Sequence, residues 1–466
     1  MGSAGSAAVT AGRRRLAIRR QLATTPGRLR LAGALIAAGA IVFGVAGAHA
    51  ASTREAAVRD VQRTEPLLVA AVDLSASLSD AHALAASSFL VGGPEPATST
   101  ALYRRSLRDA AGGVTRLAAE PGTAAVAQRI TEQLPAYSGL IENARAYRRQ
   151  GYPVGSAYLR RASVERDAIL AQGRELYRIQ ATSLTRGYRA ATDGSTLALT
   201  LLAGLALLGL LVATQVYLAR TTHRIINPGL AAATVLLLGV TAWIVVADVA
   251  QQRQLRSAQR SGSDPIELLT ATRILALRGQ SNESVGLAAR VGGGGEPNLT
   301  KIDTAFAAVT RPIGVARAGA ALGSRGLLDA AAAVVEHSPP AKAAVDEIYR
   351  AYRTYIEAHR RVVAQERVGA FTKAIKLAAA PPAVGAAATD ERECRVQDPA
   401  PSSGAAATAL NCLLVREVEA SRARFDDATA AAGSALGGLA FGIPALTALA
   451  ALLALLGVRL RLEEYR

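Results

Sequence analysis

Four long apolar runs constrain the fold of this chain more than any other feature of its sequence. Each has the roughly 20 residues that an α-helix needs to cross a bilayer. The runs occupy residues 31–50, 196–218, 228–248 and 435–458. Two long polar segments, 51–194 and 249–434, separate the first run from the second and the third from the fourth. This pattern predicts a membrane protein with four transmembrane helices.

The distribution of positive charge predicts how these helices are oriented. The chain has a net charge of +17, a value that on its own also suits a nucleic-acid-binding protein. The excess lies in short flanks beside the apolar runs: a tail at 1–30, a loop at 219–227 and a tail at 459–466. Because positively charged flanks stay in the cytoplasm, we expect a multi-pass protein of the cell membrane with both termini inside and both polar segments outside. No nucleic-acid partner is expected.

The N-terminal region leaves two alternatives open. Ala48-His49-Ala50 resembles a signal-peptide cleavage site, so the first run is either a cleaved signal peptide or a transmembrane helix. We favour the transmembrane helix because the helical pattern continues past Ala50. The basic residues before this run are a topology signal, or they also bind membrane lipid or a cytoplasmic partner. They are Arg13, Arg14, Arg15, Arg19 and Arg20.

The chain contains two cysteines, and both lie in the second polar segment. They are Cys394 and Cys412. Because this segment is expected outside the cytoplasm, where thiols are oxidised, we predict that the two cysteines form a disulfide. The alternative is a pair of free thiols in a flexible loop.

The two polar segments resemble each other, which predicts an internal duplication. SDAHALAASSFLVGGPEP (79–96) aligns with QSNESVGLAARVGGGGEP (280–297), and AYRR (146–149) aligns with AHRR (358–361). The second copy carries an inserted loop, rich in Pro and Ala, at 381–407. Few β-branched or aromatic runs occur, and Gly and Pro mark the breaks, so both segments are predicted to be helical. The expected fold is all-α, with four transmembrane helices and two tandem extracytoplasmic four-helix bundles.

The turns of these bundles predict where a partner binds. Helices are expected at 51–91, 99–118, 122–150 and 154–194 in the first copy, and at 249–291 and 368–434 in the second. An up-and-down bundle then gathers its first and third turns at the end away from the membrane. Arg and Tyr there are favoured interface residues; the alternative is that the residues only cap and solvate the turns. The predicted partner-binding residues are Glu95, Arg148, Arg149 and Tyr152 in the first copy and Glu296, Arg360 and Arg361 in the second.

The sequence contains no signature of catalysis or of cofactor binding. Its five histidines are scattered without the spacing of metal ligands. The GGGG at 292–295 is followed by Glu-Pro and not by the Gly-Lys-Ser/Thr of a phosphate-binding loop. We therefore expect no enzyme activity, no cofactor, no metal site and no catalytic residue. The predicted cytoplasmic segments are too short to fold as a domain, so any output inside the cell requires a recruited partner.

Three stretches resemble the GlnX-like four-span membrane proteins of actinobacteria, whose outer domains are similar to the four-helix-bundle sensor modules of chemoreceptors. They are TTPGRLRL (24–31), ARAYRRQGYPVGSAYLRRAS (144–163) and HRIINPGLAAATVLLLG (223–239). The resemblance implies that an extracytoplasmic solute-binding protein for acidic amino acids engages the bundles and that a cytoplasmic Ser/Thr protein kinase receives the signal. The second copy lacks the Gly-Tyr-Pro of the 144–163 stretch, so its tip need not bind equivalently.

The leading hypothesis is a non-enzymatic transmembrane signal transducer, sensing aspartate or glutamate by this resemblance. One alternative is a structural or envelope-assembly membrane protein whose bundles are static spacers. Another is a chemoreceptor-like sensor that binds a small molecule directly between the helices of a bundle. A homodimer is left open by the sequence.

Overall fold

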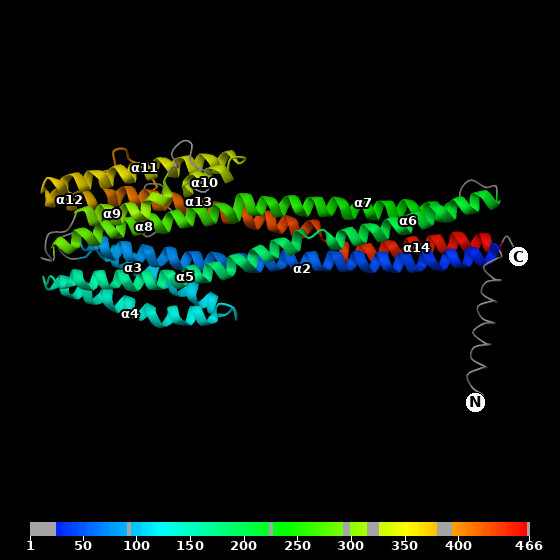
Figure 1. The fold of residues 1–466 in the computed structure, drawn as a ribbon, viewed down its shortest axis with the longest axis horizontal. Helices are drawn as coiled ribbons and strands as arrows, with labels where there is room; N and C mark the ends of the chain where they lie inside the picture. The colour runs from blue at the N-terminus through cyan, green and yellow to red at the C-terminus, as the bar shows by residue number, and fades with distance from the viewer. Residues whose placement is uncertain are drawn as a thin grey trace, which may run out of the picture. The chain divides into compact units, whose positions relative to one another are not determined.

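The computed structural model of the chain describes residues 25–90, 95–222, 227–291, 299–314, 326–379 and 394–463. Within these ranges the chain forms helices and no β-strand, which confirms the predicted all-α fold (Figure 1). It divides into two compact units. The apolar unit holds the chain up to Asp60, Gly187–Leu255 and the chain from Ala430, and the polar unit holds Val61–Arg186 and Arg256–Thr429.

Four helices of the described chain are long and apolar enough to cross a membrane, as predicted. Their segments in the apolar unit are the first part of α2 (Thr25–Ser88), α6 (Ser195–Thr222), most of α7 (Pro228–Ser257) and α14 (Leu439–Glu463). Large apolar side chains lie on the outward faces of these helices: Ile41, Leu202 and Val235 are each at least 64% exposed. Such exposed apolar faces are typical of contact with lipid, and the chain is a multi-pass membrane protein.

Small residues set the close contacts inside the apolar unit. A methyl group added at Gly204 of α6 would lie 2.8 Å from the ring of Phe43, and one added at Gly442 of α14 would lie 2.7 Å from the ring of Trp243. The fourth apolar run, predicted from residue 435, begins as a helix only at Leu439. The reason is a turn after α13 in which Gly438 takes a φ of 81°, a left-handed conformation that favours glycine.

A buried polar cluster lies in the apolar unit where α7 leaves its apolar stretch. Arg54 of α2 forms an ion pair with Asp248 of α7, and both side chains are at most 7% exposed. Arg54 also donates a hydrogen bond to the carbonyl of Asp193 at 3.0 Å. The side-chain amide of Gln251 donates to the carbonyl of Ala191 at 3.3 Å. The cluster therefore joins α2 and α7 to the corner between α5 and α6.

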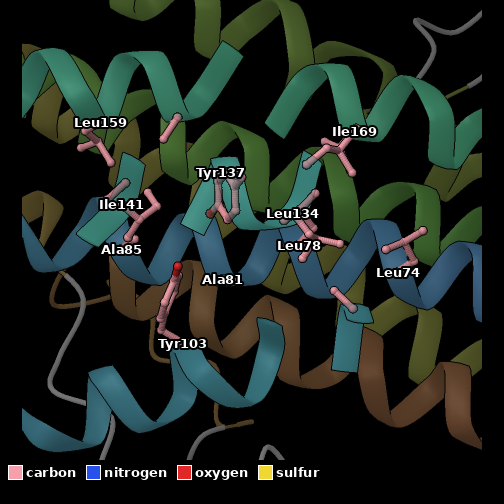
Figure 2. Close-up of a cluster of buried hydrophobic side chains, with 14 of the residues drawn as sticks. Leu74, Leu78, Ala81, Ala85, Tyr103, Leu134, Tyr137, Ile141, Leu159 and Ile169 are labelled. Atoms are coloured by element: carbon pink, nitrogen blue, oxygen red, sulfur yellow. The ribbon is translucent and has the colours of Figure 1, made fainter. Parts of the chain in front are cut away.

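The first part of the polar unit is a four-helix bundle of α2, α3 (Ala97–Ala118), α4 (Ala124–Arg149) and α5 (Gly155–Thr192). From Leu67 to Ser88 no residue of α2 is exposed, so this part of the helix is buried on all its faces. On the face toward the other three helices, buried apolar residues recur every three or four positions and form a stripe. They include Leu74, Leu78, Ala81 and Ala85. Figure 2 shows this stripe among side chains of the other three helices, such as Tyr103, Tyr137 and Leu159. The turns of the bundle begin and end within three residues of their predicted bounds.

The second part of the polar unit contains helices of more varied length. They are α8 (Asp264–Val291), α9 (Leu299–Thr310), α10 (Leu327–Val334), α11 (Pro339–Arg367), α12 (Phe371–Ala378) and α13 (Ser403–Ala435). The helix expected over 249–291 is interrupted by a π-helical turn at Ala258–Ser263. The interruption coincides with a close approach, because a methyl group at Gly262 would lie 2.6 Å from Cβ of Phe425 in α13. Such turns are common at functional positions within long helices.

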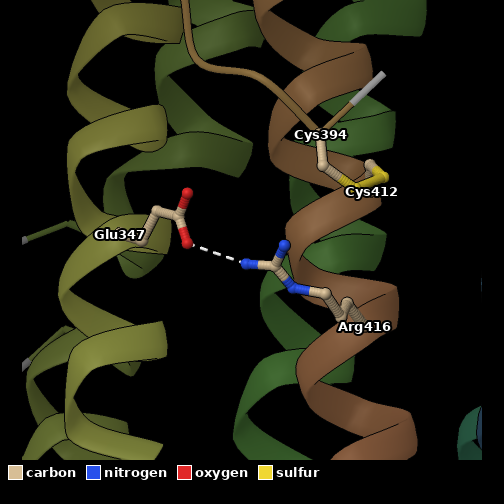
Figure 3. Close-up of a disulfide and its surroundings, with 4 residues drawn as sticks. All are labelled: Glu347, Cys394, Cys412 and Arg416. Carbon is tan, nitrogen blue, oxygen red and sulfur yellow. Dashed lines mark hydrogen bonds and ion pairs between the residues drawn. A yellow bond between two sulfur atoms is a disulfide. The ribbon is translucent and has the colours of Figure 1, made fainter. Parts of the chain in front are cut away.

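The insertion predicted at 381–407 is shorter at its C-terminal end than expected. Residues 394–402 are irregular, but α13 begins at Ser403, so the last five residues of the predicted loop are helical. The predicted disulfide between Cys394 and Cys412 is present, with a Cα–Cα distance of 5.1 Å (Figure 3). It tethers the irregular segment to α13.

Hydrophobic contacts join the two bundles within the polar unit, whose described residues form two buried apolar clusters. Leu287 of α8 and Val362 of α11 belong to the same buried cluster as Leu78 and Tyr137 of the first bundle. Val69 of α2 in turn packs against the core of the second bundle. Because packed interiors transmit strain, we expect a displacement of a helix in one bundle to displace side chains in the other. The internal duplication itself stays a prediction.

Candidate functional site

The turn between α4 and α5 positions three of the predicted partner-binding residues. Helix α4 ends in a Schellman cap, in which the amide of Gly151 donates to the carbonyl of Arg148 and the amide of Tyr152 donates to the carbonyl of Tyr147, both at 2.9 Å. Gly151 has a φ of 74°, a conformation that glycine adopts without strain. The Gly-Tyr-Pro sequence after Arg149 therefore ends the helix and turns the chain back into α5.

Glu95, the fourth predicted residue, is held by a buried arginine near the same turn. Its carboxylate accepts a hydrogen bond from Arg145 at 3.0 Å, and Arg145 also binds Glu142 at 2.8 Å. The guanidinium of Arg145 lies 4.1 Å from the centre of the Tyr103 ring. Burial raises the pKa of the Tyr103 hydroxyl to about 12. Glu95 therefore ties the segment before α3 to α4, and its carboxylate is engaged inside the bundle.

Contacts with aromatic rings hold the side chains of this turn in place. The guanidinium of Arg148 lies 5.5 Å from the centre of the Phe89 ring, and burial lowers the pKa of Arg148. Tyr147 stacks on Tyr158 with 5.2 Å between ring centres, and Tyr152 meets Tyr147 edge-on at 6.3 Å. Such aromatic contacts hold their side chains in defined positions. The turn is therefore a preformed surface.

The exposed residues of this turn form a small patch, here called the bundle-end surface: Arg149, Tyr152 and Val154. Tyr152 is 57% exposed and Val154 is 43% exposed, and Arg149 is also exposed. Tyr and Arg are enriched among the residues that contribute most to protein–protein binding. The patch combines a cation, an aromatic ring and an apolar side chain on a backbone fixed by the cap. It suits the docking of a protein.

In the second bundle, Arg360 and Arg361 do not lie at the end of a helix, so their predicted position is wrong. Helix α11 continues to Arg367, and the amide of Gly369 (φ 72°) closes its cap. The two arginines lie about two turns earlier. Arg360 is exposed, whereas Arg361 donates to the carbonyl of Ala400 at 2.6 Å. Glu296 and the predicted cytoplasmic arginines Arg13, Arg14, Arg15, Arg19 and Arg20 lie outside the described residues.

An ion pair occupies the end of α11 instead. By its distance from the cap, Glu366 takes the position that Arg148 has in α4. Its carboxylate accepts a hydrogen bond from Arg290 of α8 at 2.9 Å, and the guanidinium of Arg290 lies 5.1 Å from the centre of the Phe371 ring. The two bundle ends therefore present different charges and different exposed side chains.

Buried polar contacts that were not predicted from the sequence lie inside the first bundle and between the two bundles. His82 of α2 contacts the hydroxyls of Tyr137 at 3.3 Å and Ser163 at 2.9 Å. Burial lowers the pKa of His82 well below its ordinary value, so the ring is neutral. Arg166 of α5 is 2% exposed and donates to the hydroxyl of Ser281 in α8 at 2.9 Å. One sequence feature could have predicted these contacts: His82 falls on the apolar stripe of α2.

A second buried cluster ties together three helices of the second bundle. The carboxylate of Glu283 in α8 contacts both Nδ1 of His359 in α11 and the hydroxyl of Ser403 in α13. The carboxylate lies between the other two groups, so the histidine is not placed to take a proton from the serine as a general base would. Within the described residues, no group of three or more His, Cys, Asp or Glu side chains is placed to bind a metal. The arrangement suits structural support.

Comparison with known proteins points to sensing. Residues 56–189 match the family model of an actinobacterial sensor domain. The matched range contains the bundle-end surface and the buried contacts of His82 with Tyr137 and Ser163. No curated protein and no solved structure matches the chain. Residues 56–189 are therefore similar to a sensor domain of actinobacteria, and the same chain has four helices that can cross a membrane.

Proposed function

We propose that this chain is a non-enzymatic transmembrane signal transducer, similar to the GlnX-like proteins, with both termini in the cytoplasm and the polar unit outside. One observation carries the proposal: α2 runs without a break from Thr25 to Ser88. A helix of the matched sensor domain is therefore continuous with a helix that can cross a membrane. Such continuity lets a shift of a sensor helix reach the other side of the bilayer.

The mechanism we propose is a small sliding or rotation of α2 and α5. Contacts between α5 and α8 support movement of the two bundles as one body, because Arg166 of α5 binds Ser281 of α8, and Asp167 of α5 forms a partly exposed ion pair with Arg278 of α8 at 3.4 Å. Helix α8 follows α7 through the π-helical turn. A displacement of α5 is thereby passed to the helix that leads to the third apolar run.

The partners we propose come from the resemblance. An extracytoplasmic solute-binding protein for acidic amino acids docks on the bundle-end surface, and a cytoplasmic Ser/Thr protein kinase receives the signal. The exposure of Tyr152, Val154 and Arg149 supports a protein as the docking partner, because exposed Tyr and Arg side chains are typical of protein–protein interfaces. The N-terminal tail and the short loop at 219–227 are the proposed contacts inside the cell.

Binding of a purified solute-binding protein to the full chain in lipid nanodiscs tests the docking surface. The variant Arg149→Glu with Tyr152→Ala changes exposed side chains and leaves Arg148 on Phe89. We expect it to bind at least about tenfold more weakly, since loss of a central Tyr or Arg commonly costs about 2 kcal/mol. Arg129→Glu, an exposed site on the same helix, is the matched control and should bind as the unaltered chain does. Equal binding by both variants would contradict the proposed surface.

A direct small-molecule sensor is a second candidate, and one observation favours it. The second bundle contains a pocket of about 690 Å³, within the range of small-molecule sites in proteins. Of the residues that line this pocket, the sequence predicted a role only for Cys394, as a disulfide partner.

A further inference from the structure

The pocket in the second bundle opens between α11, α13 and the irregular segment 394–402. Most of the side chains that line it are charged. One pair is already neutralised, because Arg416 of α13 binds Glu347 of α11 at 2.7 Å (Figure 3). The charges that remain available to a ligand are three arginines and the carboxylates of Glu357 and Asp398, so positive charge exceeds negative charge by one.

Three arginines of the lining are available in this way. Arg350, Arg353 and Arg395 form no ion pair with any other residue that the structure describes. Arg350 and Arg353 are three positions apart on α11, so they lie on one face of the helix. Arg395 belongs to the irregular segment, so the positive charge comes from two separate walls. Guanidinium groups bind carboxylates and phosphates through paired hydrogen bonds.

The wall that carries Arg395 is fixed in place. The disulfide joins Cys394, the preceding residue, to Cys412 of α13. Arg361 of α11 donates to the carbonyl of Ala400 at 2.6 Å and so anchors the segment a few residues further on. This contact also gives Arg361 a role that the sequence alignment did not predict. A wall held at both ends keeps its arginine in position before a ligand arrives, which lowers the entropic cost of binding.

We propose that this pocket binds a small organic molecule that carries two or more anionic groups, carboxylates or phosphates, spaced along one skeleton. A single inorganic anion would leave part of a pocket of about 690 Å³ unused. A molecule with two separated anionic groups contacts both walls at once. The site is distinct from the bundle-end surface, so it adds a direct chemical input to the second bundle.

Isothermal titration calorimetry on the full chain in nanodiscs of zwitterionic lipid tests the proposal with three probes: citrate, a sugar bisphosphate and inorganic phosphate. We expect citrate or the bisphosphate to bind, and whichever binds identifies the anionic group. The variant Arg350→Gln with Arg353→Gln should weaken that binding by at least about tenfold, because hydrogen bonds to charged groups are among the strongest in proteins. Arg360→Gln, exposed on the same helix and outside the pocket, should leave it unchanged.

Three results would overturn the proposal. They are the absence of binding by both organic probes, inorganic phosphate binding as tightly as either of them, and equal affinity of the arginine variant and the unaltered chain. A second variant, Cys394→Ser with Cys412→Ser, tests the fixed wall and removes no charge. It should weaken binding several-fold, and unchanged affinity would show that the wall does not contribute. Binding of the solute-binding protein to the bundle-end surface should persist in the arginine variant, so the two proposals fail separately.

Discussion

At the scale of a single residue, Gly151 determines the conformation of the turn that carries the bundle-end surface. Its φ of 74° closes the cap of α4, and no atom would lie within 4 Å of an added Cβ, so any cost of a side chain there comes from the backbone. We expect Gly151→Ala to lower the free energy of unfolding by about 1 kcal/mol. Thermal unfolding of the full chain in detergent measures this change.

The same substitution elsewhere on α4 provides the control. Gly139 is exposed in the middle of the helix, and again no atom would lie within 4 Å of an added Cβ. Gly139→Ala should raise the free energy of unfolding by roughly 0.5 to 1 kcal/mol, because alanine is the better helix former. If both substitutions changed the free energy of unfolding in the same direction, the cap conformation of Gly151 would not determine the effect of Gly151→Ala.

Single residues also show which positions at the bundle ends could be predicted from the sequence and which could not. Glu95 and Tyr152 were predicted at one bundle end because Gly and Pro punctuate the chain beside them, and the structure brings their turns together. Arg360 and Arg361 were placed by aligning AYRR with AHRR, but α11 runs about two turns further before Gly369 ends it. A four-residue match does not fix where a helix stops, whereas a glycine with positive φ does.

At the scale of elements, the contact between α2 and α13 contains a buried carboxyl group. Glu65 of α2 is 5% exposed. Burial, together with the nearby charges of Asp426 and Asp73, raises its pKa to about 7 against the opposing effect of Arg422. Arg422 of α13 itself binds Asp73 of α2 at 2.6 Å. Protonation of Glu65 therefore favours the packing of these two helices.

This contact predicts how stability depends on pH. The folded state holds a proton on Glu65 up to about pH 7, whereas in the unfolded chain Glu65 has its ordinary pKa of 4.5 and releases the proton there. The contribution of Glu65 to stability is therefore complete below pH 4.5 and is lost as the pH rises through about 7. A pKa change of this size corresponds to about 3 kcal/mol as an upper bound.

The prediction concerns the difference in free energy of unfolding between a Glu65 variant and the unaltered chain. The contributions of other titrating groups cancel in this difference. Glu65→Gln should become progressively more stable relative to the unaltered chain as the pH rises from 4.5 to 7, the interval of the shift. Thermal unfolding across this interval measures the difference. Glu419→Gln, at an exposed site on α13, is the control. A difference that does not vary with pH in the Glu65 variant would contradict the assignment.

The elements themselves were predicted with uneven success for physical reasons. The turns of the first bundle follow Gly and Pro, whose backbone preferences are local, and their bounds were nearly right. The π-helical turn at Ala258–Ser263 was missed because it accompanies a tertiary contact between Gly262 and Phe425. The start of α13 within the predicted loop was missed because an Ala-rich sequence is compatible with both loop and helix.

At the scale of the whole molecule, the four apolar helices followed directly from sequence because apolar length is a local property. The packing of both bundles into one compact unit did not follow. It depends on contacts between residues far apart in the chain, such as that of Arg166 with Ser281, which no local pattern encodes. The proposed signalling mechanism depends on these contacts and on the continuity of α2.

Spin-label distances in the apolar unit test this central claim most directly. Labels attached at Arg59→Cys of α2 and Arg189→Cys of α5 lie at exposed positions, and both native cysteines are engaged in the disulfide. Double electron–electron resonance on the full chain in nanodiscs then measures the distance between the labels. The stimulus is a purified solute-binding protein loaded with aspartate or glutamate.

We predict that the loaded binding protein shifts the distance distribution between α2 and α5, and that Arg149→Glu with Tyr152→Ala abolishes the shift. Arg129→Glu should preserve it. An identical distribution with and without the loaded binding protein is what a static spacer would produce, and it would contradict the account.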